Sequence, residues 1–350
     1  MLLINLLRNI IFNFYDYKEK PIDSGNVKFV VIHIPDQIGD AMAIFPLIRS
    51  LEKQQIKHLL IVASVMNKPV FESLKLSHTQ LTVVSMTMQD YASLKEIKNV
   101  AKAIKDQHGT PDLCIEAMRK KNLKTMLFVR TLRATTNFQV VGLSQKCYSP
   151  VCKMASRMDQ TLRAPVPMTW ALLMREAGFP AVIAKYEFPL SEDVLEEVRR
   201  ETTLWGDYIA LNLEGSVQAR TFSFTVAQKI IMTIKKATDM PVIIVHGPKG
   251  ADCAVKLTES YDDVYHLSLA PSLMRSASVI KDAFLTITPD TSILHMASAY
   301  NTPAIAIYAD YKTRWPAMQE ISETLVVGRD IDHIDLVEFE EMVRRILARI

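Results

Sequence analysis

The stretch at residues 284–310, FLTITPDTSILHMASAYNTPAIAIYAD, constrains the fold of this chain more than any other. Two short apolar runs, at 284–288 and 303–308, bracket a segment at 291–300 that has the composition of a short helix. Strands that are buried on both faces of a parallel sheet read as continuous apolar runs. The pattern therefore predicts a strand, a helix and a second strand in one parallel sheet, and so an α/β fold.

The turn at Pro289 and Asp290, between the first strand and the helix, is the first candidate for a binding site. Open parallel sheets bind ligands just beyond the carboxyl ends of their strands. There the free backbone N–H groups and the positive end of the helix dipole favour phosphate or sugar hydroxyls. The alternative is that Asp290 only caps the helix and that His295 only packs within it.

The rest of the chain repeats this alternation of strands and helices. Further strands are expected at residues 27–34, 58–63, 81–85, 111–116, 138–142, 208–213 and 241–246. Further helices are expected at 39–51, 91–106, 120–133, 168–177, 192–202, 225–235, 272–281 and 336–350. Residues 143–168 contain three prolines and read as a loop or linker.

The length of 350 residues suits two domains. We expect one over residues 1–180 and one over 181–350, each built on a doubly wound parallel sheet. Residues 1–17 form an amphipathic leading segment that is too short and too polar to span a bilayer and lacks the features of a secretory signal. This segment either lies on a membrane surface or packs on the protein as a leading helix.

Several classes of site are not signalled. The four cysteines form no CxxC pair and have no zinc spacing, so we expect reduced thiols in a cytosolic protein. No HExxH, EF-hand, Walker or GxGxxG motif occurs. The sequence therefore signals neither a metal site nor a standard dinucleotide site.

The net charge of +3 conceals an asymmetry along the chain. Residues 1–175 carry 24 Lys and Arg against 13 Asp and Glu, a net charge of +11, whereas the remainder carries 17 against 25, a net charge of −8. A basic half of this kind indicates an anionic partner such as a phosphorylated lipid, a membrane surface or nucleic acid. Nucleic acid is disfavoured because no aromatic residues interleave with the basic ones and no nucleic-acid motif occurs.

Three separated segments together resemble glycosyltransferase family 9, the bacterial heptosyltransferases. They are IGDAMAIFPLIRSL at residues 38–51, LNLEGSVQARTF at residues 211–222, and the 284–310 stretch. The resemblance implies a GT-B fold, in which two Rossmann-like domains with parallel sheets face a central cleft. It places the acceptor on the N-terminal domain and the nucleotide sugar on the C-terminal one. It implies an inverting, metal-independent transfer without a cofactor, typically of heptose from ADP-heptose to the core of lipopolysaccharide.

The resemblance also assigns roles to individual residues. Asp40 would be the catalytic base that takes the proton of the acceptor hydroxyl. Arg220 and the backbone N–H groups of Thr291 and Ser292 would stabilise the leaving diphosphate. The other donor-binding candidates are Ser216, Asp252 (for the ribose), Asp290 (for sugar hydroxyls) and His295, and the acceptor-binding candidates are Arg119, Lys120, Lys121, Lys124, Arg130 and Arg133. The same residues can also be read as a helix cap at Asp40, a surface carboxylate at Asp252 and a solvated basic helix face.

The implied partners are a nucleotide-sugar donor, a lipid A-core acceptor and the inner membrane surface, with the protein peripheral on its cytoplasmic face. The chain departs from the family pattern at Ser292, where a glycine is usual, at Arg220, where lysine is usual, and at Phe222, where tryptophan is usual. Two alternatives follow from these departures. One is a different donor, such as a UDP-hexose or UDP-N-acetylhexosamine, and the other is a catalytically silent scaffold that binds nucleotide sugars at the inner membrane.

Overall fold

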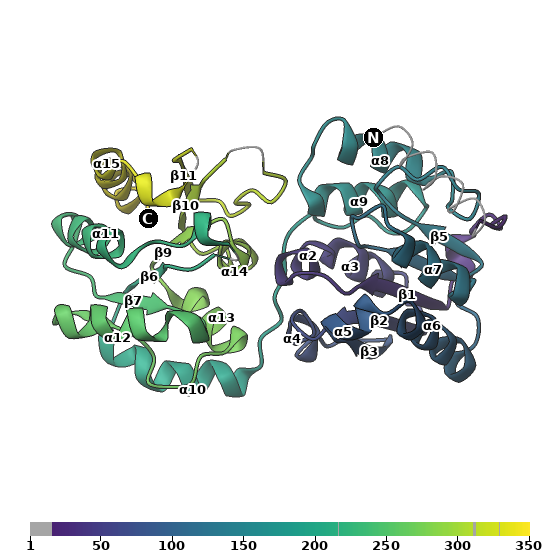
Figure 1. The fold of residues 1–350 in the computed structure, drawn as a ribbon, viewed down its shortest axis with the longest axis horizontal. Helices are drawn as coiled ribbons and strands as arrows, with labels where there is room; N and C mark the ends of the chain where they lie inside the picture. The colour runs from purple at the N-terminus through teal and green to yellow at the C-terminus, as the bar shows by residue number, and fades with distance from the viewer. Residues whose placement is uncertain (1–15, 216, 311–312, 329) are drawn as a thin grey trace. The chain divides into compact units, whose positions relative to one another are not determined.

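The computed structural model describes residues 16–215, 217–310, 313–328 and 330–350. It divides the chain into two compact units, Met1–Lys185 and Tyr186–Ile350. The sequence analysis places this boundary after residue 180. Each unit is a parallel sheet flanked by helices (Figure 1). The predicted α/β class with two Rossmann-like units is confirmed.

The sheet of the first unit has five parallel strands in the order β3-β2-β1-β4-β5. The strands are β1 (Phe29–Ile34), β2 (His58–Ser64), β3 (Gln80–Met86), β4 (Leu113–Glu116) and β5 (Thr136–Phe138). The strand order reverses between β1 and β4, so the loops that follow these two strands flank the topological switch point. In doubly wound sheets this is where ligands bind.

Helices cover both faces of this sheet. They are α2 (Ile38–Ala43), α3 (Phe45–Lys53), α4 (Pro69–Glu72), α5 (Met88–Ala92), α6 (Leu94–His108), α7 (Leu123–Leu132), α8 (Cys152–Gln160) and α9 (Val166–Glu176). The apolar side chains of α6 and α7 bury against one face, while α3, α8 and α9 pack against one another (Figure 1).

Three predictions for this unit were wrong in detail. The helix expected at residues 39–51 is two helices, α2 and α3, that meet at Ile44, because Pro46 cannot continue a helix from the preceding turn. Residues 143–168 contain α8, whose buried face consists of the small Cys152 and Ala155 and the polar Ser156 and Asp159, so no large apolar residues mark it in the sequence. The strand expected at 138–142 lies at Thr136–Phe138, where polar residues are buried.

The sheet of the second unit has six parallel strands in the order β11-β10-β9-β6-β7-β8. They are β6 (Ile209–Asn212), β7 (Val242–Val245), β8 (Val264–Tyr265), β9 (Leu285–Pro289), β10 (Ala304–Tyr308) and β11 (Ser322–Val326). The order reverses between β6 and β9, which sets a second switch point at the loops after these strands. The edge strands β8 and β11 were not predicted, because β8 is only two residues long and β11 is largely polar.

Two groups of helices flank this second sheet: α11 (Phe224–Ala237), α12 (Ala251–Ser260) and α15 (Leu336–Leu347) share one apolar core, and α10 (Glu192–Thr202), α13 (Leu273–Asp282) and α14 (Ser292–Tyr300) pack together. The β9–α14–β10 unit that opens the sequence analysis is confirmed. Within this unit, α14 ends at Asn301, whose backbone adopts a left-handed φ of 58°.

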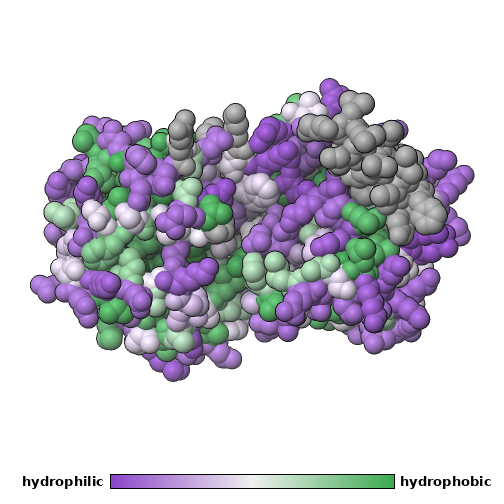
Figure 2. Space-filling view, in the orientation of Figure 1, coloured by the Kyte–Doolittle hydropathy of each residue, from purple (hydrophilic) through white to green (hydrophobic). Residues whose placement is uncertain are grey.

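The outer helix faces carry the charged residues. On the face shown in Figure 2, hydrophilic side chains cover most of the surface and apolar ones appear in patches between them. In the parts of the chain that the structure describes, no helix is long and apolar enough to cross a membrane. The amphipathic segment at residues 1–17 lies almost wholly outside the described residues, so its role stays a prediction.

Candidate active site

The candidate base, Asp40, lies in the first turn of α2, just after the carboxyl end of β1. Its carboxyl group is partly buried. Burial raises the pKa of Asp40 to about 7, and the nearby carboxylate of Asp36 adds to the rise, while Arg119 and Lys120 oppose it. A carboxyl group that titrates near neutrality is suited to accept a proton at physiological pH.

Two ion pairs hold the loop after β4: one joins it to the loop after β1 and the other joins it to α8. The Lys120 Nζ lies 2.8 Å from an Asp36 carboxylate oxygen, and Arg119 Nη2 lies 2.5 Å from a carboxylate oxygen of the buried Asp159. In this ion pair the Asp36 carboxylate is largely buried, whereas the Lys120 side chain is exposed. These cations therefore stand at the first switch point together with Asp40.

A buried histidine–glutamate pair lies beneath these loops. His33 Nδ1 is 2.7 Å from Glu116 Oε2, and neither side chain is exposed by more than 1%. The His33 ring stacks on Phe128, with 3.9 Å between ring centroids. The backbone N–H of Met118 donates to the other Glu116 oxygen at 3.1 Å, so the pair fixes the start of the loop that carries Arg119. This pair was not predicted from the sequence. The only local indication of it is a polar residue near the end of each of two otherwise apolar strands, His33 in β1 and Glu116 in β4.

The six basic acceptor candidates divide into two groups. Arg119, Lys120 and Lys121 lie in the loop before α7 and Lys124 in its first turn, at the carboxyl edge of the sheet. Arg130 and Arg133 lie at the other end of α7, which is about 15 Å long.

Arg130 and Arg133 lie at the opposite edge of the sheet, where the strands begin. There Arg130 donates to the Asp16 carbonyl at 3.4 Å, and the Arg133 guanidinium lies 5.2 Å from the centroid of the Tyr17 ring. Because α7 runs back across the sheet, its two ends cannot serve one site.

In the second unit, Arg220 and Asp290 meet at the switch point between β6 and β9. Arg220 Nη1 lies 3.3 Å from a carboxylate oxygen of Asp290 and 3.2 Å from its carbonyl oxygen. Burial raises the pKa of the Asp290 carboxyl, and the Arg220 guanidinium opposes this rise. The loop folds back on itself because Gly215 has no side chain, since a Cβ there would lie 2.4 Å from the Cβ of Arg220.

A network around Asn212 ties the ends of β6 and β9 together. Asn212 Nδ2 donates to the hydroxyls of Thr288 at 3.0 Å and of Thr291 at 3.2 Å. Thr291 is the N-cap of α14, and its hydroxyl accepts from the Ile293 N–H. No described residue accepts a hydrogen bond from the N–H of Thr291 or Ser292, so both donors are available at the start of this nine-residue helix.

His295 is buried inside the second unit. Its ring stacks on Tyr186 with 4.5 Å between centroids and 14° between planes. Burial, and to a lesser degree the Arg220 charge, lowers the pKa of His295 to about 3, so the imidazole is neutral at physiological pH. A neutral, buried ring is suited to packing beneath the site rather than to pairing with the charge of a diphosphate.

The remaining donor candidates are placed differently. Ser216 lies outside the described residues. Ser292 is the first residue of α14 and is partly buried. Asp252 is exposed in the first turn of α12 and makes no hydrogen bond or ion pair with any residue that the structure describes.

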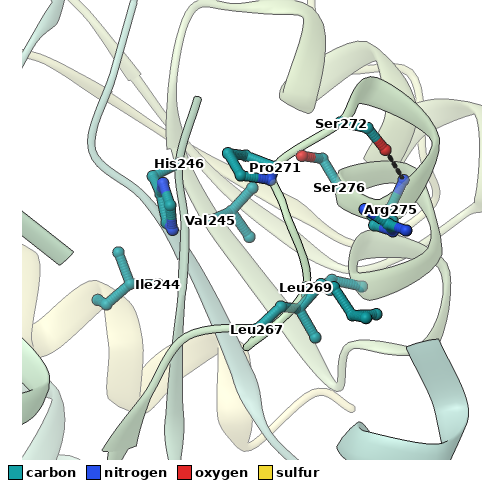
Figure 3. A pocket seen from close by; sticks show the side chains of 10 residues that line it. Ile244, Val245, His246, Leu267, Leu269, Pro271, Ser272, Arg275 and Ser276 are labelled. Atoms are coloured by element: carbon teal, nitrogen blue, oxygen red, sulfur yellow. Dashed lines mark hydrogen bonds between the residues drawn. The ribbon is translucent and has the colours of Figure 1, made fainter. Parts of the chain in front are cut away.

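A shallow, partly open hollow lies at the carboxyl end of β7 (Figure 3). Its walls are mainly apolar and come from the end of β7, the loop after β8 and α13: Ile244, Val245, His246, Leu267, Leu269, Pro271, Ser272, Arg275, Ser276 and Val279. Ser272 caps α13 by accepting from the Arg275 N–H, and the Arg275 side chain is held by Glu197 at 2.9 Å. This pocket could not be predicted from the sequence, because two stretches about twenty residues apart in the chain form it.

No metal site is formed by the described residues: no group of three or more His, Cys, Asp or Glu side chains there is placed to hold an ion.

Comparison with known proteins identifies the class. The chain has two Rossmann-like units, and the sequence profile of glycosyltransferase family 9 (heptosyltransferase) matches residues 128–332. The chain belongs to this family. It is 65% identical over 234 residues, which are 67% of this chain and 100% of the relative, to the putative uncharacterized protein YeeL of Escherichia coli (strain K12).

Solved structures show the same fold. A glycosyl transferase family 9 protein from Veillonella parvula matches with a TM-score of 0.74 and 14% identity, over 95% of this chain and 100% of that one. The ADP-heptose lps heptosyltransferase II of E. coli matches with a TM-score of 0.67 and 14% identity, over 92% and 99%. E. coli heptosyltransferase WaaC with ADP-2-deoxy-2-fluoro heptose matches with a TM-score of 0.64 and 15% identity, over 90% and 99%. The predicted family and the predicted enzyme class are confirmed.

Proposed function

We propose that this glycosyltransferase transfers heptose from ADP-heptose to the core of lipopolysaccharide, with inversion at the anomeric carbon and without a metal ion. The observation that carries the proposal is Asp40, a partly buried carboxyl group at a switch point whose pKa of about 7 suits a general base. The similarity in fold to solved heptosyltransferases supports heptose as the transferred sugar.

Asp40 acts on the acceptor. Its carboxylate takes the proton of the acceptor hydroxyl while that oxygen forms a bond to the anomeric carbon of the donor. The bond from that carbon to the diphosphate breaks, and the nucleoside diphosphate leaves with the electron pair. A single displacement of this kind inverts the configuration.

The second unit holds the donor. Arg220 and the free N–H groups of Thr291 and Ser292 stabilise the negative charge that develops on the leaving diphosphate. Asp290, anchored by Arg220, accepts hydrogen bonds from the hydroxyls of the transferred sugar. The apolar hollow beside His246 receives the base of the nucleotide, because a flat aromatic ring gains most from burial between apolar walls.

The acceptor side combines cations and apolar surface. Lys121 is exposed, and Lys124 lies 4.8 Å from the centroid of the Tyr91 ring in α5. In that short helix Met88 is 79% exposed, and in the neighbouring loop Val65 is 54% exposed. An amphiphilic acceptor with phosphates and acyl chains complements both features, which supports a place on the inner face of the inner membrane.

The test is a transfer assay with the purified protein and its Asp40→Asn variant. We expect the variant to bind the donor nucleotide normally and to lose transfer by about 100-fold or more, because only the base is removed. Full activity of the variant would exclude Asp40 as the base.

Thermal stabilisation by ADP, UDP, GDP and CMP, with and without magnesium, tests the donor, since a ligand that binds only the native state raises the melting temperature. Stabilisation by ADP alone, independent of magnesium, supports ADP-heptose. Stabilisation by UDP instead keeps the mechanism and changes the donor to a UDP-sugar. Stabilisation by none of them would contradict a nucleotide-sugar donor, whereas stabilisation without transfer to any core acceptor would favour the silent scaffold.

A further inference from the structure

Glu214 lies directly after β6, and its carboxylate fills the turn between β7 and α12. Its Oε2 accepts a hydrogen bond from the Gly247 N–H at 2.8 Å. A Cβ on Gly250 would lie 2.4 Å from Glu214 Oε1, and a Cβ on Gly247 would lie 3.2 Å from Oε2. Neither glycine therefore carries a side chain that would displace this carboxylate from the turn.

One oxygen of this carboxylate is available to a ligand. Oε2 is occupied by the Gly247 N–H, whereas no described residue donates a hydrogen bond to Oε1. Asn212 fixes the backbone of Glu214, because the Glu214 N–H donates to Asn212 Oδ1 at 3.2 Å and the Glu214 carbonyl accepts from Asn212 Nδ2 at 3.0 Å. The carboxylate itself is held by the Gly247 N–H. The acceptor is thus held in place before any ligand arrives.

Glu214 also lies between the two parts of the proposed donor site. On one side Gly247 follows His246, which lines the hollow at the end of β7. On the other side Asn212 links Glu214 to Thr291, at the start of the helix that bears the free N–H groups. In a nucleoside diphosphate the ribose joins the base to the phosphates, so a nucleotide that spans these two parts brings its ribose to Glu214.

From this placement we infer that Glu214 binds the ribose hydroxyls of the donor nucleotide, the role that the sequence analysis gave to Asp252. A carboxylate is the group that accepts hydrogen bonds from a ribose diol in dinucleotide-binding sheets, and charge-assisted hydrogen bonds of this type are strong. Asp252 is exposed on α12 and has no partner among the described residues. The inference rests on the proposed function, because it requires that a nucleotide binds this unit.

The experiment measures dissociation constants of ADP and 2′-deoxy-ADP by calorimetry for the wild type, Glu214→Gln and the matched control Asp252→Asn. UDP and 2′-deoxy-UDP replace them if only UDP stabilises the protein. Glutamine keeps the shape and can still accept from the Gly247 N–H, but it loses the charge. We expect the wild type to bind the deoxy form about tenfold more weakly. The Glu214→Gln variant should bind ADP about tenfold more weakly and lose the preference, while Asp252→Asn behaves as the wild type.

Wild-type preference and affinity in Glu214→Gln would overturn the inference, and loss of the preference in Asp252→Asn would return the role to Asp252. If Glu214→Gln does not fold, Gly250→Ala replaces it, because the added Cβ displaces the carboxylate without changing its charge, and the same loss of preference is expected. Absence of nucleotide binding by the wild type would refute the proposed donor and this inference with it. Binding by the wild type without an effect in either variant would refute the inference alone.

Discussion

Arg220 and Asp290, seventy residues apart in the chain, form an ion pair with 3.3 Å between the guanidinium and the carboxylate. The Arg220 side chain is 40% exposed and the Asp290 side chain only 14%. Asp290 thus anchors a cation that still presents N–H groups to solvent. The pair connects the loops after β6 and β9, and it places a positive charge beside the free N–H groups of α14.

The first prediction concerns this cation. Arg220→Ala should weaken binding of the nucleoside diphosphate by roughly 10-fold to 100-fold, because a charge-assisted contact to the diphosphate is lost. The melting temperature should change little, since a half-exposed ion pair contributes at most about 1 kcal/mol. Calorimetry and thermal unfolding of the same samples measure both. Arg199→Ala breaks the exposed pair with Asp282 in the same unit and is the control. Equal affinity in Arg220→Ala and the wild type would remove Arg220 from the donor site.

The second prediction concerns Asp40 and the pH dependence of transfer. Because burial and Asp36 raise the pKa of Asp40 to about 7, kcat/KM should increase from pH 5 to pH 7 and level off above it. Asp36→Asn removes a neighbouring negative charge and so lowers the pKa of Asp40. The rise of kcat/KM should therefore occur at lower pH in this variant. A rate profile with no change between pH 5 and pH 8 would contradict the assignment.

Asp40 also affects stability, with a sign opposite to that of an ion-paired acid. Its pKa of about 7 in the folded state exceeds the ordinary value of 3.8, so between pH 4 and pH 7 the folded state binds more protons than the unfolded state. The free energy of unfolding therefore falls across this window as the pH rises. Asp40→Asn should be more stable than the wild type at pH 8 and equal to it at pH 4, as measured by denaturant unfolding.

The sequence predicted the sheets well and the site in part, for a physical reason. Strands such as β1 and β9 are buried on both faces, so their apolar runs are visible locally. Glu214, Asn212 and the His33–Glu116 pair acquire their roles only when strands distant in sequence become neighbours. His33 pairs directly with Glu116 across the β1–β4 register, 83 residues away in the chain. The pattern of apolar residues along a single strand or helix cannot predict a contact between side chains so far apart in the chain.

The third prediction concerns His295. Burial lowers the pKa of this imidazole from 6.5 to about 3, so between these values the unfolded state binds a proton that the folded state does not. Stability is then lost as the pH falls from 6.5 towards 3, by up to about 1.4 kcal/mol per pH unit. His295→Phe keeps a flat ring for stacking on Tyr186 and should flatten this acid-side slope. An unchanged slope in urea unfolding between pH 6.5 and pH 4.5 would show that His295 titrates normally.

The fourth prediction concerns the acceptor and compares the two ends of α7. Lys121→Gln and Lys124→Gln should raise KM for a phosphorylated core acceptor several-fold, with a weaker salt dependence than the wild type. The reason is that these cations lie at the carboxyl edge of the sheet, as Asp40 does, and attract the phosphates. Arg130→Gln removes the same charge from the opposite end of α7, where Arg130 contacts the Asp16 carbonyl, and should leave KM unchanged. Steady-state kinetics at about 50 mM and about 300 mM salt, which bracket the ionic strength at which the Debye length is about 10 Å, separate the two cases. An equal increase in KM for all three variants would mean that the acceptor responds to net charge rather than to a site beside Asp40.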